Sequence, residues 1–155
     1  MVTVTIRLKK HVAHYVKEHY GNPVKLPRKL QVRYNFLSCI QKEFEPASHN
    51  RVKLLSTTIE VHLNEKDLRQ HGASVKPGMM FYINNLFEEQ LRNEMFFTVN
   101  RLHYVEGNSI TGAIKAWMQQ NGFDEETFPF ATIHQAYYTM RKSLIKNRNN
   151  SHKAA

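Results

Sequence analysis

Residues 79–104 are the longest stretch of this sequence in which apolar side chains recur at helical spacing without an intervening glycine or proline. The apolar positions lie three to five residues apart, which places them approximately on one face of an α-helix. They are Tyr82, Leu86, Leu91, Met95, Val99 and Leu102. A helix of this length needs partners for its apolar face, so the pattern predicts a helical C-terminal half.

Alternating apolar residues predict two strands in the N-terminal half. Residues 2–8 alternate between apolar and polar side chains, and residues 59–63 do the same at the end of a segment that begins at Val52. A two-residue period is typical of strands with one buried face, so we expect the two segments to pair. Between them, helical spacing predicts a helix over residues 9–20, ended by Gly21-Asn22-Pro23.

Residues 30–45 fit two structures. Apolar residues alternate as in a strand over residues 30–36, yet from Val32 to Phe44 they recur every four residues as on a helical face. We favour a helix because the second pattern is longer and ends just before Pro46, where the preceding residue is disfavoured in helical geometry.

Two more helices are predicted after the long one. Ser109 is suited to cap a helix that ends at Asn121-Gly122, and a final helix is expected from about Phe130 to Lys146. The predicted fold class is α+β, with a small two-stranded N-terminal unit that also contains helices and a helical C-terminal half with a helix-turn-helix-like arrangement. The predicted domains are residues 1–78, residues 79–148 and a disordered tail, residues 149–155.

Charge is distributed unevenly along the chain, whose net charge is +9. Residues 1–42 contain nine basic residues (Lys or Arg) and one acid. Residues 43–126 contain eight basic residues and twelve acids, and residues 127–155 contain five basic residues and no acid. Two basic ends around an acidic middle favour a polyanionic partner, since each neutralised phosphate releases a bound counterion. The sequence therefore favours nucleic-acid binding over a soluble protein that merely happens to be basic.

The final predicted helix has the features of a DNA recognition helix. Its apolar stripe, expected in the core, consists of Ile133, Ala136, Tyr137, Met140 and Leu144. In recognition helices the first side chains contact base edges and later basic side chains hold phosphates. The predicted base contacts are therefore His134, Gln135 and Tyr138, and the predicted phosphate contacts are Arg141, Lys142, Lys146 and Arg148.

Two observations bear on that interpretation. Basic residues near a helix C-terminus also offset the helix dipole, yet ordinary solvated helices mix both signs and no acid follows Glu126. The turn from Asn121 to Pro129 has nine residues, longer than the three or four of a standard helix-turn-helix. We expect Phe123 and Phe128 to fix it.

The first basic segment offers an alternative site. Lys25, Arg28 and Lys29 surround Pro27 and are further predicted phosphate contacts. Tyrosines between nearby cations suit single-stranded nucleic acid or RNA, although burial of most of these rings is the simpler expectation. A protein-interaction module for an acidic partner is a third interpretation. A homodimer is also predicted, through phenylalanines of the long helix: Phe81, Phe87, Phe96 and Phe97.

Four segments carry a resemblance to a known group of proteins. They are Ile110-Thr-Gly-Ala-Ile114, Asn121-Gly-Phe-Asp-Glu-Glu126, Tyr137-Tyr-Thr-Met-Arg-Lys142 and Asn22-Pro-Val-Lys-Leu-Pro27. Together with the N-terminal strand and helix they resemble DNA-binding proteins from prophages and mobile elements of anaerobic gut bacteria. The resemblance covers most of the chain. It implies attachment to double-stranded DNA through the last helix, at Tyr138, Arg141 and Lys142, in transcription regulation or as an accessory factor of a mobile element.

Signals for an enzyme are weak. His11, His14 and Glu18 share one predicted helix face, but no second cluster completes a zinc site, and the acids of the long helix, Glu88 among them, are expected to face solvent. No Gly-rich phosphate loop or nucleophile elbow occurs, so we expect no catalytic residue, metal or cofactor. The single Cys39, the lack of a signal peptide and the lack of a membrane span favour the cytoplasm.

Overall fold

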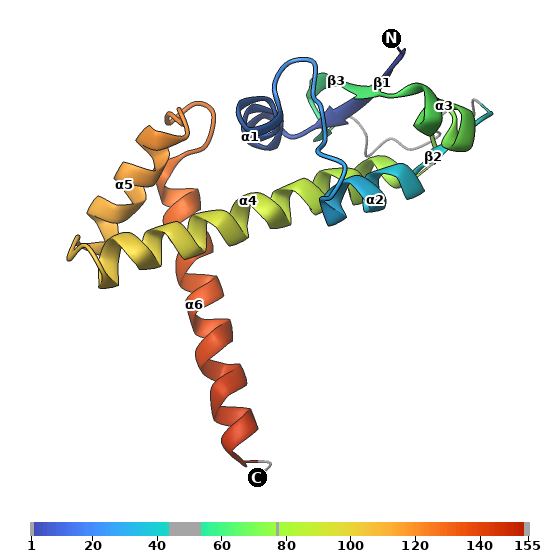
Figure 1. Cartoon of the computed structure of the whole chain (residues 1–155). Coiled ribbons are helices and arrows are strands. Elements are labelled where there is room, and N and C mark those ends of the chain that lie inside the picture. The colour runs from blue at the N-terminus through green and yellow to red at the C-terminus, as the bar shows by residue number, and fades with distance from the viewer. Residues whose placement is uncertain (1, 44–53, 77, 154–155) are drawn as a thin grey trace. The chain divides into compact units, whose positions relative to one another are not determined.

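The computed structural model describes residues 2–43, 54–76 and 78–153, with side chains described for residues 3–43, 54–76 and 78–146 (Figure 1). These residues form six helices and two small antiparallel sheets of two strands each, so the fold class is α+β, as predicted. The chain divides into two compact units, Met1–Glu89 (unit 1) and Gln90–Ala155 (unit 2).

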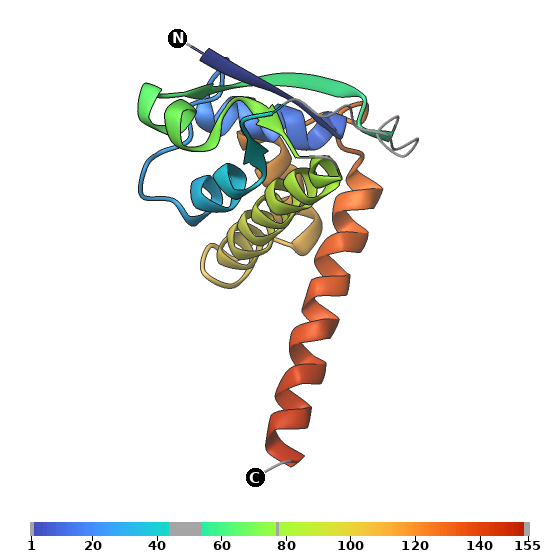
Figure 2. The ribbon, with the colours of Figure 1, turned by 90° about the vertical axis from the view of Figure 1, so that its right-hand side faces the viewer.

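Unit 1 is built on the predicted strand pair. Strand β1 (Val2–Leu8) pairs antiparallel with β3 (Thr57–Leu63), in a register that places Ile6 opposite Ile59. The alternating apolar side chains of both strands are buried, which confirms the pairing expected from their two-residue period. Helix α1 (Lys10–Tyr20) lies along this sheet and ends at Gly21, which has a positive φ (Figure 2).

The ambiguous segment of unit 1 contains both structures. Helix α2 (Gln31–Ser38) is followed by strand β2 (Ile40–Gln41), so the predicted helix over residues 30–45 is correct only in its first half. Strand β2 pairs with β4 (Ser74–Val75), and a residue 35 positions away in the chain therefore decides the conformation at Ile40. Local spacing contains no information about that pairing.

Gly72 is required where these two strands begin to approach. Helix α3 (Glu65–His71) ends at Gly72, whose φ of +93° favours glycine. A Cβ atom at this position would overlap the carbonyl oxygen of Gln41, so only glycine permits the approach of β2 to the end of α3.

Unit 2 contains the helices predicted for the C-terminal half. They are the second part of α4 (Met79–Tyr104), α5 (Ile110–Gln120) and α6 (Phe130–Lys153). Trp117 of α5 and Tyr137 of α6 are fully buried. The Tyr137 ring lies 5.5 Å from that of Phe96, and its hydroxyl donates a hydrogen bond of 2.7 Å to Asn100.

Helix α6 is longer and less buried than its sequence predicts. It continues to Lys153 rather than ending near Lys146, since no glycine or proline follows Pro129. Its C-terminal part extends beyond α5 and the second part of α4 (Figures 1 and 2). Leu144, predicted to be in the core, is therefore 52% exposed, whereas Ile133 and Tyr137 are buried as expected.

Candidate nucleic-acid interface

The nine-residue connection before α6 is well ordered by packing and hydrogen bonds. The Phe123 ring lies 5.3 Å from Trp117 and 5.4 Å from Phe128, and both phenylalanines are buried, which confirms that they fix this turn. Asp124 accepts a hydrogen bond of 2.7 Å from the Thr127 amide. The Glu125 carboxylate accepts from the first amide of α6, so negative charge lies at the positive end of that helix.

Helix α5 begins as predicted. The Ser109 hydroxyl accepts a hydrogen bond of 3.0 Å from the Gly112 amide, which is the geometry of an N-cap. Helices α5 and α6 are therefore both capped by their own sequence, and the turn between them is fixed by side chains of unit 2.

The three predicted base-contacting residues occupy the first turns of α6. His134 lies between two aromatic rings four residues away on either side, 5.6 Å from Phe130 and 4.7 Å from Tyr138. His134 and Tyr138 are half-buried, while Gln135 is exposed. The start of this face thus presents the exposed Gln135 amide next to a row of rings that includes His134 and Tyr138.

The predicted phosphate contacts continue along the same helix. Lys142 and Lys146 are exposed and Arg141 is half-buried, and within the described part of the chain no acid forms an ion pair with any of the three. Burial raises the pKa of the Tyr137 hydroxyl, and the nearby charge of Arg141 opposes this increase. Arg148 belongs to α6, but its side chain lies outside the described part.

The other predicted cations lie in unit 1, on the link between α1 and α2 (residues 21–30, called the link below). Val24 forms two hydrogen bonds of 2.8 Å with β3, donating to Glu60 and accepting from His62, and its side chain is buried. This anchors the link while Lys25, Arg28 and Lys29 remain exposed. The two predicted cation groups therefore belong to different units.

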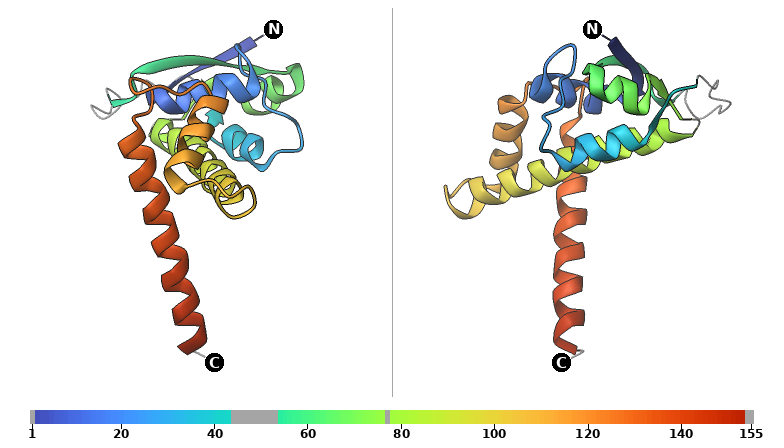
Figure 3. Two further views of the ribbon diagram at one scale, coloured as in Figure 1. Left: turned by 90° about the vertical axis from the view of Figure 1, so that its left-hand side faces the viewer. Right: turned by 45° about the vertical axis from the view of Figure 1, so that its right-hand side comes forward.

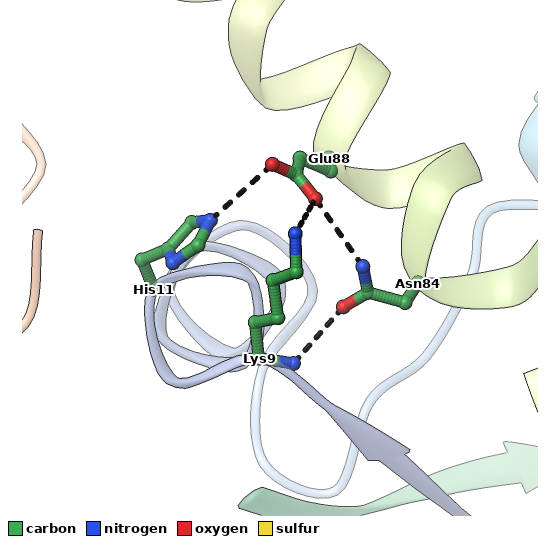
Figure 4. Close-up of polar contacts among 4 residues, drawn as sticks. All are labelled: Lys9, His11, Asn84 and Glu88. Atoms are coloured by element: carbon green, nitrogen blue, oxygen red, sulfur yellow. Dashed lines mark hydrogen bonds and ion pairs between the residues drawn. The ribbon is translucent and has the colours of Figure 1, made fainter. Parts of the chain in front are cut away.

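A buried polar network in unit 1 was not predicted (Figure 4). Glu88, expected to face solvent, is buried, and its carboxylate lies 2.8 Å from the Lys9 ammonium and 3.7 Å from the His11 ring. The buried amide of Asn84 bridges the Glu88 carboxylate and the Lys9 main chain. Glu88 is buried because Lys9 and Asn84 compensate its lost hydration. The network fixes the junction of β1 and α1 against the first part of α4. It also pairs the Lys9 ammonium with an acid.

One histidine lies beside an acid: His11 is directed toward Glu88 (Figure 4). Among the residues that the structure describes, no three His, Cys, Asp or Glu side chains form a group that could hold a metal ion.

Cys39 is buried, and burial raises the pKa of its thiol. Since the thiolate is the reactive form, we expect native Cys39 to react with an aromatic disulfide reagent on the order of tenfold more slowly than in denaturant. The chain has one cysteine, so the absorbance of the released thiolate reports this position directly. Equal rates in buffer and in denaturant would contradict the buried position.

In the described part of the chain, no helix has the length and apolar composition needed to cross a lipid bilayer. Comparison of the sequence and the fold with protein families, with curated proteins and with solved structures finds no match.

Proposed function

We propose that this protein binds double-stranded DNA through the exposed face of α6, as a cytoplasmic regulator or accessory factor of a mobile element. The observation that supports the proposal best is the unneutralised charge of α6. Lys142 and Lys146 are exposed and Arg141 is half-buried on α6, and no described acid pairs with them. The C-terminal part of this helix extends past its helical neighbours in unit 2 (Figure 1). A polyanion is the partner that such a segment favours.

The straight, extending form of α6 suits a groove of duplex DNA (Figure 1). The major groove of B-DNA admits one α-helix, and a helix that stands clear of its neighbours can enter along much of its length. In this arrangement Gln135 would pair with an adenine edge, with His134 and Tyr138 beside it. The later cations would contact phosphates on either side of the groove.

An exposed apolar residue of α6 fits the same proposal. Ile145 is 53% exposed and lies three residues after Lys142, close to the same face of the helix. In the major groove an apolar side chain can contact the methyl group of thymine. Ile145 would then contribute to base selection.

A homodimer remains part of the proposal on a smaller surface. Phe87 and Phe96 are buried, so neither is available for the predicted contact between copies. Phe97 is 71% exposed and Phe81 is half-buried. The reason for the difference is local: Phe87 packs near Tyr20, and Phe96 near Tyr137.

The proposal is tested by fluorescence anisotropy of labelled duplex DNA at several salt concentrations. We expect the logarithm of the wild-type affinity to fall linearly with the logarithm of the salt concentration. Arg141→Ala/Lys142→Ala removes two phosphate contacts and should reduce that slope by roughly two units.

The matched control is Arg7→Ala/Arg101→Ala, which removes the same charge from exposed positions of β1 and α4. It should leave the slope within about half a unit of wild type. Lack of binding at low salt, or equal slopes for the two double variants, would reject α6 as the DNA-binding element.

Single-stranded nucleic acid or RNA binding is a second candidate, favoured by the exposure of Lys25, Arg28 and Lys29 on an anchored link. Preference for an unpaired oligonucleotide in the same assay, lost when all three become alanine, would support it over duplex binding. Absence of salt-sensitive binding to either nucleic acid would instead favour the acidic protein partner.

A further inference from the structure

Unit 1 contains a depression of about 450 Å³ that is lined by residues of the link, α2 and α3. Figure 3 shows the backbone of these three segments. Its size is within the usual range for small-molecule sites. The side chains that matter for its chemistry are Arg28, Arg33, Tyr34, Lys66, Asp67 and Gln70. They come from segments more than 30 residues apart in the sequence.

A buried ion pair holds the walls of the depression together. The Arg33 guanidinium donates a hydrogen bond to the Asp67 carboxylate, and both side chains are buried. Arg33 also donates a hydrogen bond of 3.1 Å to the Leu26 carbonyl, so it connects α2 to α3 and to the link. The Asp67 amide in turn donates to the Asn64 side chain that caps α3. The depression is therefore fixed without a ligand.

The charge of the depression is positive. The negative charge of Asp67 is compensated by Arg33, and the neighbouring acid Glu65 lies 3.6 Å from Arg69. Arg28 and Lys66 are exposed, and neither pairs with an acid within the described residues. Two cations without local partners thus line one depression.

An exposed aromatic ring lies among these cations. Tyr34 is 59% exposed, whereas Tyr15 of the preceding helix is buried as a core residue. Burying a ring of this size would stabilise the fold by about 2 kcal/mol, and a tyrosine can bury its ring while its hydroxyl stays at the surface. The hydroxyl therefore does not explain why the Tyr34 ring is exposed. A ring beside unpaired cations is the combination that stacks on a nucleobase while the cations bind its phosphate.

We propose that this depression binds one nucleotide, with the base stacked on Tyr34 and the phosphate bound by Arg28 and Lys66. Gln70 supplies hydrogen-bonding groups for the base or sugar. Inorganic phosphate would bind the cations without contacting the ring. A nucleoside would stack on the ring without pairing with the cations. The proposal concerns unit 1 only and stands whether or not α6 binds DNA.

The first test is titration calorimetry of the full chain at low salt with adenosine 5′-monophosphate, adenosine and inorganic phosphate as separate probes. We expect the nucleotide to bind at least about tenfold tighter than either of the others, since only it engages both the ring and the cations. Equal affinities for the nucleotide and inorganic phosphate would overturn the proposal.

Variants assign the binding to the depression. Tyr34→Ala and Arg28→Ala should each weaken nucleotide binding by about tenfold, whereas Tyr34→Phe, which keeps the ring, should remain close to wild type. The matched control Arg7→Ala removes an exposed cation of unit 1 that does not line the depression. Equal weakening by this control would show that binding follows net charge, and would overturn the assignment.

A 5′-phosphorylated single-stranded tetranucleotide distinguishes the source of the nucleotide. Tyr34-dependent binding that is tighter than that of the mononucleotide would assign the depression to an unpaired strand. Equal Tyr34-dependent affinities would assign it to a free nucleotide. Binding of either probe that is unchanged in Tyr34→Ala would overturn the stacking role.

Discussion

Replacing Asp67 with alanine should lower the free energy of unfolding of unit 1 by about 3 to 5 kcal/mol. The Arg33 and Asp67 side chains are only 10% and 12% exposed, so the variant leaves a guanidinium buried without its counter-charge. The remaining contact of Arg33 with the Leu26 carbonyl does not compensate a full positive charge. Urea denaturation followed by far-UV circular dichroism measures the change.

Two controls separate the buried charge from a general effect of substitution. Arg33→Met/Asp67→Leu removes both charges and should recover most of the loss, because an apolar pair of similar size often replaces a buried ion pair at little cost. Glu65→Ala breaks the exposed pair with Arg69 in the same helix and should change stability by less than about 1 kcal/mol. A loss in Asp67→Ala no larger than that in Glu65→Ala would contradict a buried, structural ion pair.

The unit that unfolds can be identified as well. The single tryptophan, Trp117, lies in unit 2, so its fluorescence reports that unit while circular dichroism reports the helices of both. We expect Asp67→Ala to lower the urea midpoint measured by circular dichroism more than the midpoint measured by tryptophan fluorescence. Coincident shifts in both signals would mean that the two units unfold together.

The elements predicted correctly are those specified by their own residues. The helix over residues 79–104 has the predicted bounds because its apolar spacing continues for 26 residues without a breaker. The Ser109 cap and the packing of Phe123 are also local features. Strand β2 was missed because its two residues take their conformation from β4, which comes more than 30 residues later.

Charged residues were harder to place than apolar ones. Glu88 carries the same signal in the sequence as a solvent-facing acid, yet it is buried because Lys9 and Asn84 compensate its charge. The segments that supply those partners are distant in sequence, so a helical wheel cannot identify them. The cations of α6 were easier to identify as unpaired, because no acid follows Glu126 and few possible partners are nearby in the sequence.

The depression in unit 1 has no signal in the sequence that single-segment analysis could find. Lys66 lies in the acidic middle of the chain, where the net negative charge gives no sign of a cation site. Arg28 lies in the basic N-terminal segment. Only the fold brings the two to one depression. Charge counted along the chain therefore predicts a polyanionic partner but not the number or the position of its binding sites.

Replacing Trp117 with alanine should lower the free energy of unfolding of unit 2 by about 3 to 5 kcal/mol. The Trp117 side chain is fully buried and its ring lies against Phe123, which orders the turn that leads into α6. The variant removes the only tryptophan, so unfolding must be followed by circular dichroism.

Trp117→Phe is the informative control. The indole Nε1 is buried and has no hydrogen-bond partner among the described residues, an arrangement that costs about 1 to 3 kcal/mol. Phenylalanine removes that uncompensated donor while retaining most of the apolar contact with Phe123, so it should cost only about 1 kcal/mol. Equal losses in the two variants would contradict both the cost of the uncompensated donor and the role of the contact with Phe123. The turn before α6 would then depend on the full size of the indole rather than on an aromatic ring beside Phe123.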